Sequence, residues 1–231
     1  MKTLILEKRE LYAKAADELC ALLREKPDAV FTLAAGRTML PLWEELARRV
    51  AEGSVSFSKA RFFQTAEFLD VPEEKSLRRM TEEHFVCRTD LRPEACFWLE
   101  AERPEACEEA LEAAGGLDMA VLGIGDNAHI GLNEPATPWS SPCRIQKLTD
   151  KTKRQYAWLF PEGTAPEKAV TMGIRTLTRA KQILALCVGE EKAPATFSML
   201  YARDDSYIPA AFLQLPANVT VFADPEAAKN L

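Results

Sequence analysis

The sequence of 231 residues has only two histidines, and its six cysteines are widely separated, with no Cys-x-x-Cys pair. A structural zinc site is not expected, because such sites need clustered cysteine and histidine ligands. A disulfide framework is not expected either at this cysteine density and chain length. No apolar run approaches the roughly 20 residues that a membrane-spanning helix requires. We therefore expect a reduced, cytoplasmic protein without a metal site or a membrane partner.

Positive charge is also in short supply. The 29 Lys and Arg residues are outnumbered by 35 Asp and Glu residues, which leaves a formal net charge of −6. Nucleic acids and anionic membrane surfaces repel such a chain, so neither is an expected partner. The sequence contains no linker, internal repeat or low-complexity segment, and residues 1–231 are interpreted as a single domain.

The sequence does contain an alternation of apolar runs and amphipathic segments along its whole length. Five apolar runs, typical of strands that are covered on both faces, predict strands at 29–34, 60–66, 117–124, 183–188 and 219–223. Helical spacing predicts helices at 7–24, 39–50, 74–86, 104–114, 168–179 and 190–200. This alternation indicates an α/β fold with a doubly wound, mostly parallel sheet and helices on both faces.

Ligands of such sheets bind beyond the carboxyl ends of the strands, so the segments that follow predicted strands are the candidates for a binding site. The most informative segment is Gly123-Ile-Gly-Asp-Asn-Ala-His-Ile-Gly-Leu-Asn-Glu-Pro135. Its glycines let the backbone pass close to a ligand, and His129 is able to carry protons near neutral pH. Glu134 is near enough in sequence to fold back and fix the orientation of that histidine. The alternative is a tight turn in which the histidine is only structural.

Two further segments at strand ends carry groups that suit an anion. Gly36, Arg37 and Thr38 precede a predicted helix, where they offer backbone N–H groups, a guanidinium and a hydroxyl at its positive end. Lys192 stands at a parallel place after Gly189, where its ammonium group suits a phosphate. The alternatives are an ordinary turn with Thr38 as the helix cap, and a lysine that is simply solvated.

Taken together, these segments resemble the glucosamine-6-phosphate deaminase/6-phosphogluconolactonase superfamily, and most closely its galactosamine-6-phosphate isomerase branch. The resemblance covers nearly the whole chain and is most specific over 115–135, where Leu-Asn-Glu-Pro after the histidine favours the amino-sugar enzymes over the lactonases. It also rests on Leu33-Ala-Ala-Gly-Arg-Thr-Met-Leu-Pro-Leu, Arg61-Phe-Phe-Gln-Thr-Ala-Glu-Phe, Leu186-Cys-Val-Gly-Glu-Glu-Lys-Ala and Ile208-Pro-Ala-Ala-Phe-Leu-Gln-Leu.

The resemblance implies a reaction on a hexosamine 6-phosphate, in which aldose–ketose isomerisation is coupled to loss of ammonia without a metal or an organic cofactor. It implies that His129, held by Glu134, assists opening of the sugar ring, and that Gly36, Thr38 and Lys192 bind the phosphate. A small-molecule sugar phosphate is thus the expected partner, and the resemblance is also compatible with a homo-oligomer.

The chain departs from the family pattern where the family has Asp-Glu and this sequence has Ala66-Glu67. In the family that aspartate removes the C2 proton, and alanine accepts no proton. In one interpretation Glu67 or Asp126 takes over the proton transfer. In a second, the pocket serves a changed reaction, for example on a sugar phosphate that lacks the amino group. A 6-phosphogluconolactonase-like hydrolysis is a further alternative. In a third, the protein binds a sugar phosphate without turning it over.

Two other differences concern the turn before the histidine and the phosphate loop. The turn reads Asn-Asp-Gly in the deaminases and Asp126-Asn127-Ala128 here, and an asparagine at its second position suits the galactosamine branch. The phosphate loop contains Arg37, a large cation in a cramped turn. This residue is expected to change the orientation of the phosphate site. We therefore include Asn127 among the candidate catalytic residues and Arg37 among the candidate phosphate-binding residues.

Overall fold

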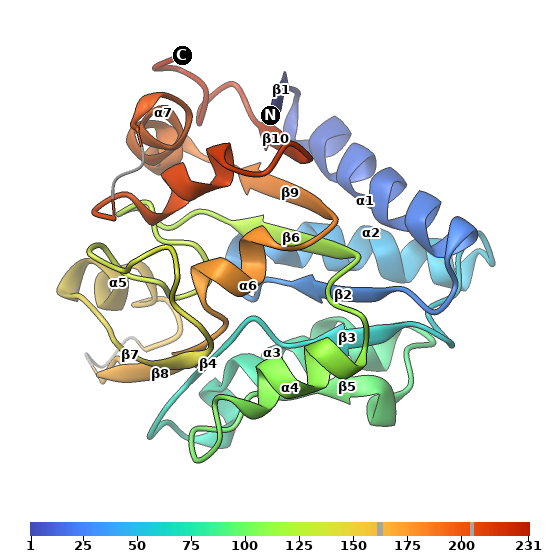
Figure 1. The fold of residues 1–231 in the computed structure, drawn as a ribbon. Coiled ribbons are helices and arrows are strands. Elements are labelled where there is room, and N and C mark those ends of the chain that lie inside the picture. The colour runs from blue at the N-terminus through green and yellow to red at the C-terminus, as the bar shows by residue number, and fades with distance from the viewer. Residues whose placement is uncertain (161–163, 204–205) are drawn as a thin grey trace.

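The computed structural model describes residues 1–160, 164–203 and 206–231. Its centre is a parallel sheet with the strand order β1-β10-β9-β6-β2-β3-β5 (Figure 1). These strands are β1 (Lys2–Ile5), β2 (Val30–Leu33), β3 (Arg61–Phe63), β5 (Cys96–Phe97), β6 (Met119–Gly123), β9 (Gln182–Cys187) and β10 (Val219–Ala223). The predicted α/β class with a mostly parallel sheet is confirmed.

Helices cover both faces of this sheet. Because successive side chains of a strand point to opposite faces, the strands contribute to two separate cores. In β6, for example, Met119 and Val121 belong to one core, and Ala120 and Leu122 belong to the other. The first core is closed by α1 (Lys8–Glu25), α2 (Leu40–Ala51) and α3 (Leu77–His84). The second is closed by α4 (Ala106–Ala113), α6 (Ile174–Thr178) and α7 (Ala193–Tyr201).

The direction in which strands are added reverses between β2 and β6. From β2 the chain proceeds outward to β3 and β5, and then returns to the other side of β2 as β6, followed by β9 and β10. In Figure 1 the strands β2, β6 and β9 run side by side, with their carboxyl ends at the same edge of the sheet. Open α/β sheets bind ligands beyond this edge, at the point of reversal.

A second, smaller sheet was not predicted from the sequence. It consists of β4 (Ala66–Phe68), β8 (Lys168–Thr171) and β7 (Arg144–Lys147), which pair antiparallel in the order β4-β8-β7. The predicted helix at 168–179 is therefore wrong in its first part, where β8 lies, and α6 occupies only the second part. The predicted strand at 60–66 is divided, because β3 ends at Phe63 and β4 begins in the other sheet. The pairing partners lie far away in sequence, so local spacing gave no sign of them.

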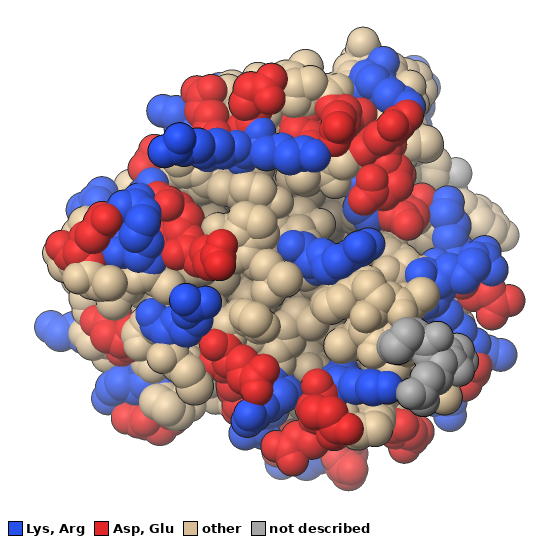
Figure 2. Space-filling view, turned by 180° about the vertical axis from the view of Figure 1, so that it is seen from behind, with Lys and Arg blue, Asp and Glu red and all other residues tan. Residues whose placement is uncertain are grey.

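No helix in the described part of the chain is long and apolar enough to cross a membrane. Figure 2 shows the face opposite to that of Figure 1, on which acidic and basic side chains alternate around uncharged surface. This face therefore has no extended field of one sign.

Candidate active site

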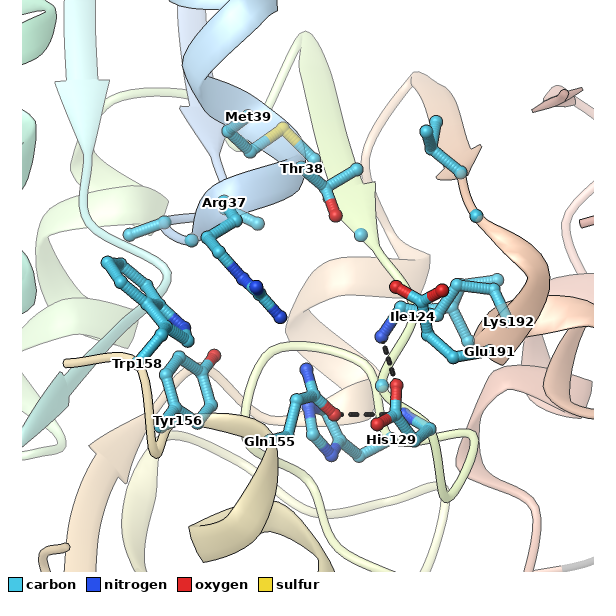
Figure 3. A pocket seen from close by; sticks show the side chains of 18 of the residues that line it. Arg37, Thr38, Met39, Ile124, His129, Gln155, Tyr156, Trp158, Glu191 and Lys192 are labelled. Carbon is cyan, nitrogen blue, oxygen red and sulfur yellow. Dashed lines mark hydrogen bonds and ion pairs between the residues drawn. The ribbon is translucent and has the colours of Figure 1, made fainter. Parts of the chain in front are cut away.

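A cavity of about 350 Å³ opens at the carboxyl ends of β2, β6 and β9, where the strand order reverses. Six of the residues singled out in the sequence line it, namely Gly36, Arg37, Thr38, Asp126, His129 and Lys192. Figure 3 shows Arg37 and Thr38 on one side of this cavity, and His129 and Lys192 across from them. The fold thus brings together three loops that are separated by tens of residues in the sequence.

Two of these loops have the same local construction. Gly36 has φ +142° and Gly189 has φ +98°, values that a residue with a side chain rarely adopts. Each glycine is followed by one turn of 3-10 helix and then by an α-helix, α2 or α7, with a proline in its first turn. Proline suits that place because the N–H groups of the first turn have no partner within the helix. Two helix N-termini therefore face one cavity, and each favours a bound anion.

Lys192 lies at the start of α7, where its ammonium group is paired with the carboxylate of Asp126. The lysine side chain is only 7% exposed, and the aspartate side chain is 26% exposed. The backbone N–H of Asp126 donates to the side-chain oxygen of Gln155, at 2.9 Å. The cation that was predicted to bind phosphate is therefore paired with a carboxylate.

His129 is connected to Glu134 through the side chain of Asn127. The Oδ1 atom of Asn127 lies 2.7 Å from Nδ1 of the histidine, and its Nδ2 donates to Oε2 of Glu134 at 2.6 Å. Glu134 also accepts from the backbone N–H of Thr149 at 3.0 Å, and Oγ1 of Thr152 lies 3.2 Å from Nδ1 of the histidine. The predicted proximity of His129 and Glu134 exists, but an amide stands between them.

The imidazole of His129 is fully buried, and burial lowers its pKa from the ordinary value of 6.5 to about 4. Glu134 and Asp126 raise the pKa, whereas Lys192 lowers it. Removal from water disfavours the charged imidazolium more than the nearby carboxylates favour it. The histidine is therefore neutral throughout the physiological pH range.

Gly125 is required by this histidine. A Cβ atom placed on Gly125 would lie 2.2 Å from Cε1 of the His129 ring, far inside the contact distance. The ring therefore packs directly on the backbone of the glycine that follows β6. Gly123, two residues earlier, is less constrained, because a Cβ there meets only Cε of Met39 at 3.5 Å.

Glu67, for which a role in proton transfer was predicted, is not among the residues that line this cavity. Its carboxylate accepts from the backbone N–H groups of Phe68, Leu77 and Arg78 and from the side-chain amide of Gln64, at 2.7–2.8 Å. These bonds cap the start of α3 and use the oxygens of the carboxylate fully. Glu67 lines a different cavity, beyond the carboxyl ends of β3 and β5.

Ala66 is 5% exposed and belongs to the core next to Phe68. It pairs with Thr171 of β8, whose Oγ1 would lie 3.0 Å from a Cβ placed on Gly131. Gly131 lines the cavity, whereas Ala66 is not among its lining residues. The position at which the resemblance implies a base therefore holds only a methyl group.

Residues 155–158 form a part of the cavity that the sequence did not predict. They begin at the last residue of α5 (Asp150–Gln155) and contribute Gln155, Tyr156 and Trp158 to the lining. The guanidinium carbon of Arg37 lies 5.7 Å from the centre of the Trp158 ring. Burial raises the pKa of Tyr156, and the charges of Glu134 and Asp126 raise it further. No periodic apolar pattern marks this short segment, so local sequence offered no signal.

A family model described as glucosamine-6-phosphate isomerases/6-phosphogluconolactonase matches residues 7–222. The chain belongs to this family. The family member glucosamine-6-phosphate deaminase of Arthrobacter sp. (strain FB24) is 35% identical over 232 residues, covering 96% of this chain and 89% of that protein. Glucosamine-6-phosphate deaminase 1 of Giardia intestinalis is 32% identical over 226 residues, covering 94% of this chain and 85% of that protein.

Solved structures of the family agree with the fold. A monomeric glucosamine-6-phosphate deaminase matches this chain with a TM-score of 0.96 and 31% identity, and both chains are covered completely. The 6-phosphogluconolactonase of Thermotoga maritima matches with a TM-score of 0.77 and 21% identity, covering 96% of this chain and 98% of that one. The lactonase therefore shares the fold, whereas the deaminase shares both the fold and substantial sequence.

Proposed function

We propose that the cavity binds a hexosamine 6-phosphate and that the protein acts on it as an isomerase/deaminase. The observation that carries this proposal is the convergence of the Gly36 turn, Lys192 and His129 on one cavity, in a chain of the amino-sugar phosphate family. Each of these features serves a different part of such a substrate.

The phosphate is held between the two helix N-termini. Backbone N–H groups after Gly36 and Gly189, the hydroxyl of Thr38 and the guanidinium of Arg37 all border this end of the cavity. A guanidinium binds phosphate through paired hydrogen bonds, which a single ammonium does not provide. When the phosphate binds, Arg37 leaves the Trp158 ring and contacts the phosphate. Lys192 likewise leaves Asp126 and contacts the phosphate.

His129 opens the sugar ring. Its neutral imidazole accepts the proton of the C1 hydroxyl and returns a proton to the ring oxygen. This transfer requires an unprotonated base within hydrogen-bonding distance of the hydroxyl. The burial that lowers the pKa of His129 keeps the base unprotonated at pH 7.

The proton at C2 needs a separate acceptor, because position 66 has none and Glu67 is bound at α3. Asp126 is the carboxylate beside His129 that remains, and it becomes free when the phosphate draws Lys192 away. Loss of a positioned base lowers the rate by about two to four orders of magnitude. We therefore propose that turnover is slow and that Ala66 limits it.

Ala66 also supports a second candidate function, in which the protein binds the sugar phosphate without turning it over. The two candidates share one binding site and differ only in ammonia release. The configuration of the substrate at C4 is left to the experiment. Asn127 favours galactosamine 6-phosphate, whereas the named relatives are glucosamine-6-phosphate deaminases.

The experiment titrates both hexosamine 6-phosphates into the wild-type protein and into Lys192→Gln by calorimetry, and measures ammonia release in parallel. Binding by the wild type that is weakened in Lys192→Gln supports the site, and no binding of either epimer overturns it. Ammonia release that rises by about two to four orders of magnitude in Ala66→Asp supports the deaminase. Binding without ammonia from either protein leaves the binding function, and hydrolysis of 6-phosphogluconolactone would instead support the lactonase alternative.

A further inference from the structure

We infer that Asp224 is a positioning residue of the cavity, which holds the Gly189 turn, and with it Lys192, through hydrogen bonds to the backbone of that turn. Asp224 is not among the residues that line the cavity, whereas Gly189 and Lys192 are. It therefore acts on a ligand only through this turn. The hydrogen bonds belong to the unliganded protein, and only their effect on ligand affinity rests on the proposed function.

The fold places Asp224 beside the Gly189 turn. Asp224 directly follows β10, the strand that lies between β1 and β9 in the sheet (Figure 1). Ala223 at the end of β10 pairs with Cys187 at the end of β9, and the backbone N–H of Asp224 donates to the carbonyl of Cys187 at 3.0 Å. Two segments 35 residues apart in the sequence therefore meet at the carboxyl ends of neighbouring strands.

The carboxylate of Asp224 is completely buried, and backbone N–H groups are its principal partners. Both of its oxygens accept from the N–H of Gly189 at 3.1 Å, and Oδ1 also accepts from the N–H of Ala227 at 2.8 Å. Burial of a carboxylate without such donors is strongly unfavourable. The ammonium group of Lys8 lies 3.5 Å away, but this side chain is 54% exposed and adds little in water.

Gly189 has both of its backbone polar groups in use. Its φ of +98° lies in a region that residues with a side chain rarely adopt. Its carbonyl accepts from the N–H of Lys192 at 3.0 Å, and its own N–H donates to Asp224. The two bonds together fix the direction in which the chain leaves β9. Lys192, three residues further on at the start of α7, is positioned by the same turn.

Asp224 also has a local role, which has to be separated from its role at Gly189. The bond to Ala227, three residues further on, is a local cap that a serine makes as well. The shorter side chain of serine does not extend to Gly189. Asparagine keeps the length of aspartate and one oxygen, and Oδ1 alone accepts from both N–H groups. Asp224→Ser therefore removes the bond to Gly189 alone, and Asp224→Asn keeps both bonds without the charge.

The first experiment measures hydrogen exchange of backbone amides by nitrogen-15 NMR on the full-length protein without ligand. In Asp224→Ser we expect the Gly189 amide to exchange about tenfold faster than in the wild type, the loss of one hydrogen bond. In Asp224→Asn it stays at the wild-type rate. The amide of Val121, in the central strand β6, reports global unfolding.

The contrary results of this experiment are specific. Equal acceleration of Gly189 and Val121 in Asp224→Ser would show a global loss of stability and overturn the inference. A Gly189 amide that exchanges in the wild-type protein as fast as an unstructured one would overturn it without any variant. The inference therefore stays falsifiable even if Asp224→Ser does not fold.

The second experiment titrates glucosamine 6-phosphate into the three folded proteins by calorimetry. We expect the wild-type affinity in Asp224→Asn and at least about tenfold weaker binding in Asp224→Ser. Wild-type affinity in Asp224→Ser, or an equal loss in both variants, contradicts the positioning role. Absence of binding by the wild type would overturn the proposed function instead, and the exchange rates would still decide whether Asp224 holds the turn.

Discussion

The ammonium group of Lys192 is paired with the carboxylate of Asp126, the residue next to the asparagine that contacts His129. Asn127 and Asp126, which are adjacent in the chain, therefore contact different groups of the cavity. Asn127 places an uncharged group against the base, and Asp126 places a charge against the cation. A phosphate that enters the cavity must compete with Asp126 for Lys192.

Replacing that carboxylate tests the competition. In Asp126→Asn the lysine is free, so we expect glucosamine 6-phosphate to bind about tenfold more tightly, which corresponds to about 1.4 kcal/mol. Turnover, if present, falls because the proposed C2 base is lost. Calorimetry and ammonia release measure the two effects separately. Glu226→Gln is the matched control, since it removes another carboxylate at the cavity that pairs with Lys8 instead. Unchanged or weaker binding in Asp126→Asn would contradict the competition.

Glu67 is predicted to stabilise the fold rather than to catalyse. Glu67→Ala removes the acceptor of backbone N–H groups at the start of α3 and of the Gln64 amide. Donors left without a partner cost about 1–3 kcal/mol, so the free energy of unfolding in urea falls by this amount. Ligand affinity of the folded protein stays at the wild-type value. Glu74→Ala, at an exposed glutamate before the same helix, serves as the control and is expected to be neutral. Weakened binding in Glu67→Ala with unchanged stability would reverse the assignment.

A pair of glycine variants tests the packing under His129. Gly125→Ala places a methyl group 2.2 Å from the imidazole, so the ring must leave its position or the loop must shift. We expect loss of the buried histidine signal in NMR and at least tenfold weaker ligand binding. Gly123→Ala adds the same methyl group at ordinary contact with Met39, and it is expected to keep both properties. Equal behaviour of the two variants would show that the close approach is unimportant.

The buried histidine also makes stability depend on pH. Its pKa is about 4 in the folded protein and 6.5 in its ordinary state, so below pH 6.5 the unfolded chain binds more protons. The contribution of His129 to the free energy of unfolding is therefore fully present above pH 6.5. It is lost as the pH falls toward 4, by about 3 kcal/mol in total. Urea unfolding at several pH values measures how steeply the free energy of unfolding changes with pH. We expect this pH dependence to be weaker in His129→Gln than in the wild-type protein. An equal pH dependence in the two proteins would assign the acid sensitivity to other groups.

Much of the fold was predictable from the sequence because its strands are buried on both faces and its helices are amphipathic. The runs at 29–34 and 117–124 correspond to β2 and β6, and the spacing at 7–24 corresponds to α1. The short edge strands β1 and β5 were missed, since they are only half-covered and carry little apolar pattern. The sheet of β4, β8 and β7 was missed because these strands form only by pairing with segments far away in the sequence.

The candidate site, too, was predictable from the sequence only in part. His129, Glu134 and the two glycine turns were singled out because each local pattern has a chemical meaning at a strand end. Trp158, Gln155 and the pairing of Lys192 with Asp126 were not predicted, since these contacts join segments that no local pattern connects.

The sequence by itself determined which groups are available, because residue types set the donors, acceptors, charges and backbone freedom that any fold of this chain must use. Only the tertiary structure decided how those groups are paired. It directed Glu67 to the start of α3 and Asp126 to Lys192, and it placed an amide between His129 and Glu134. Hydrogen bonds and ion pairs depend on distances of a few ångströms, and packing of the two cores sets those distances.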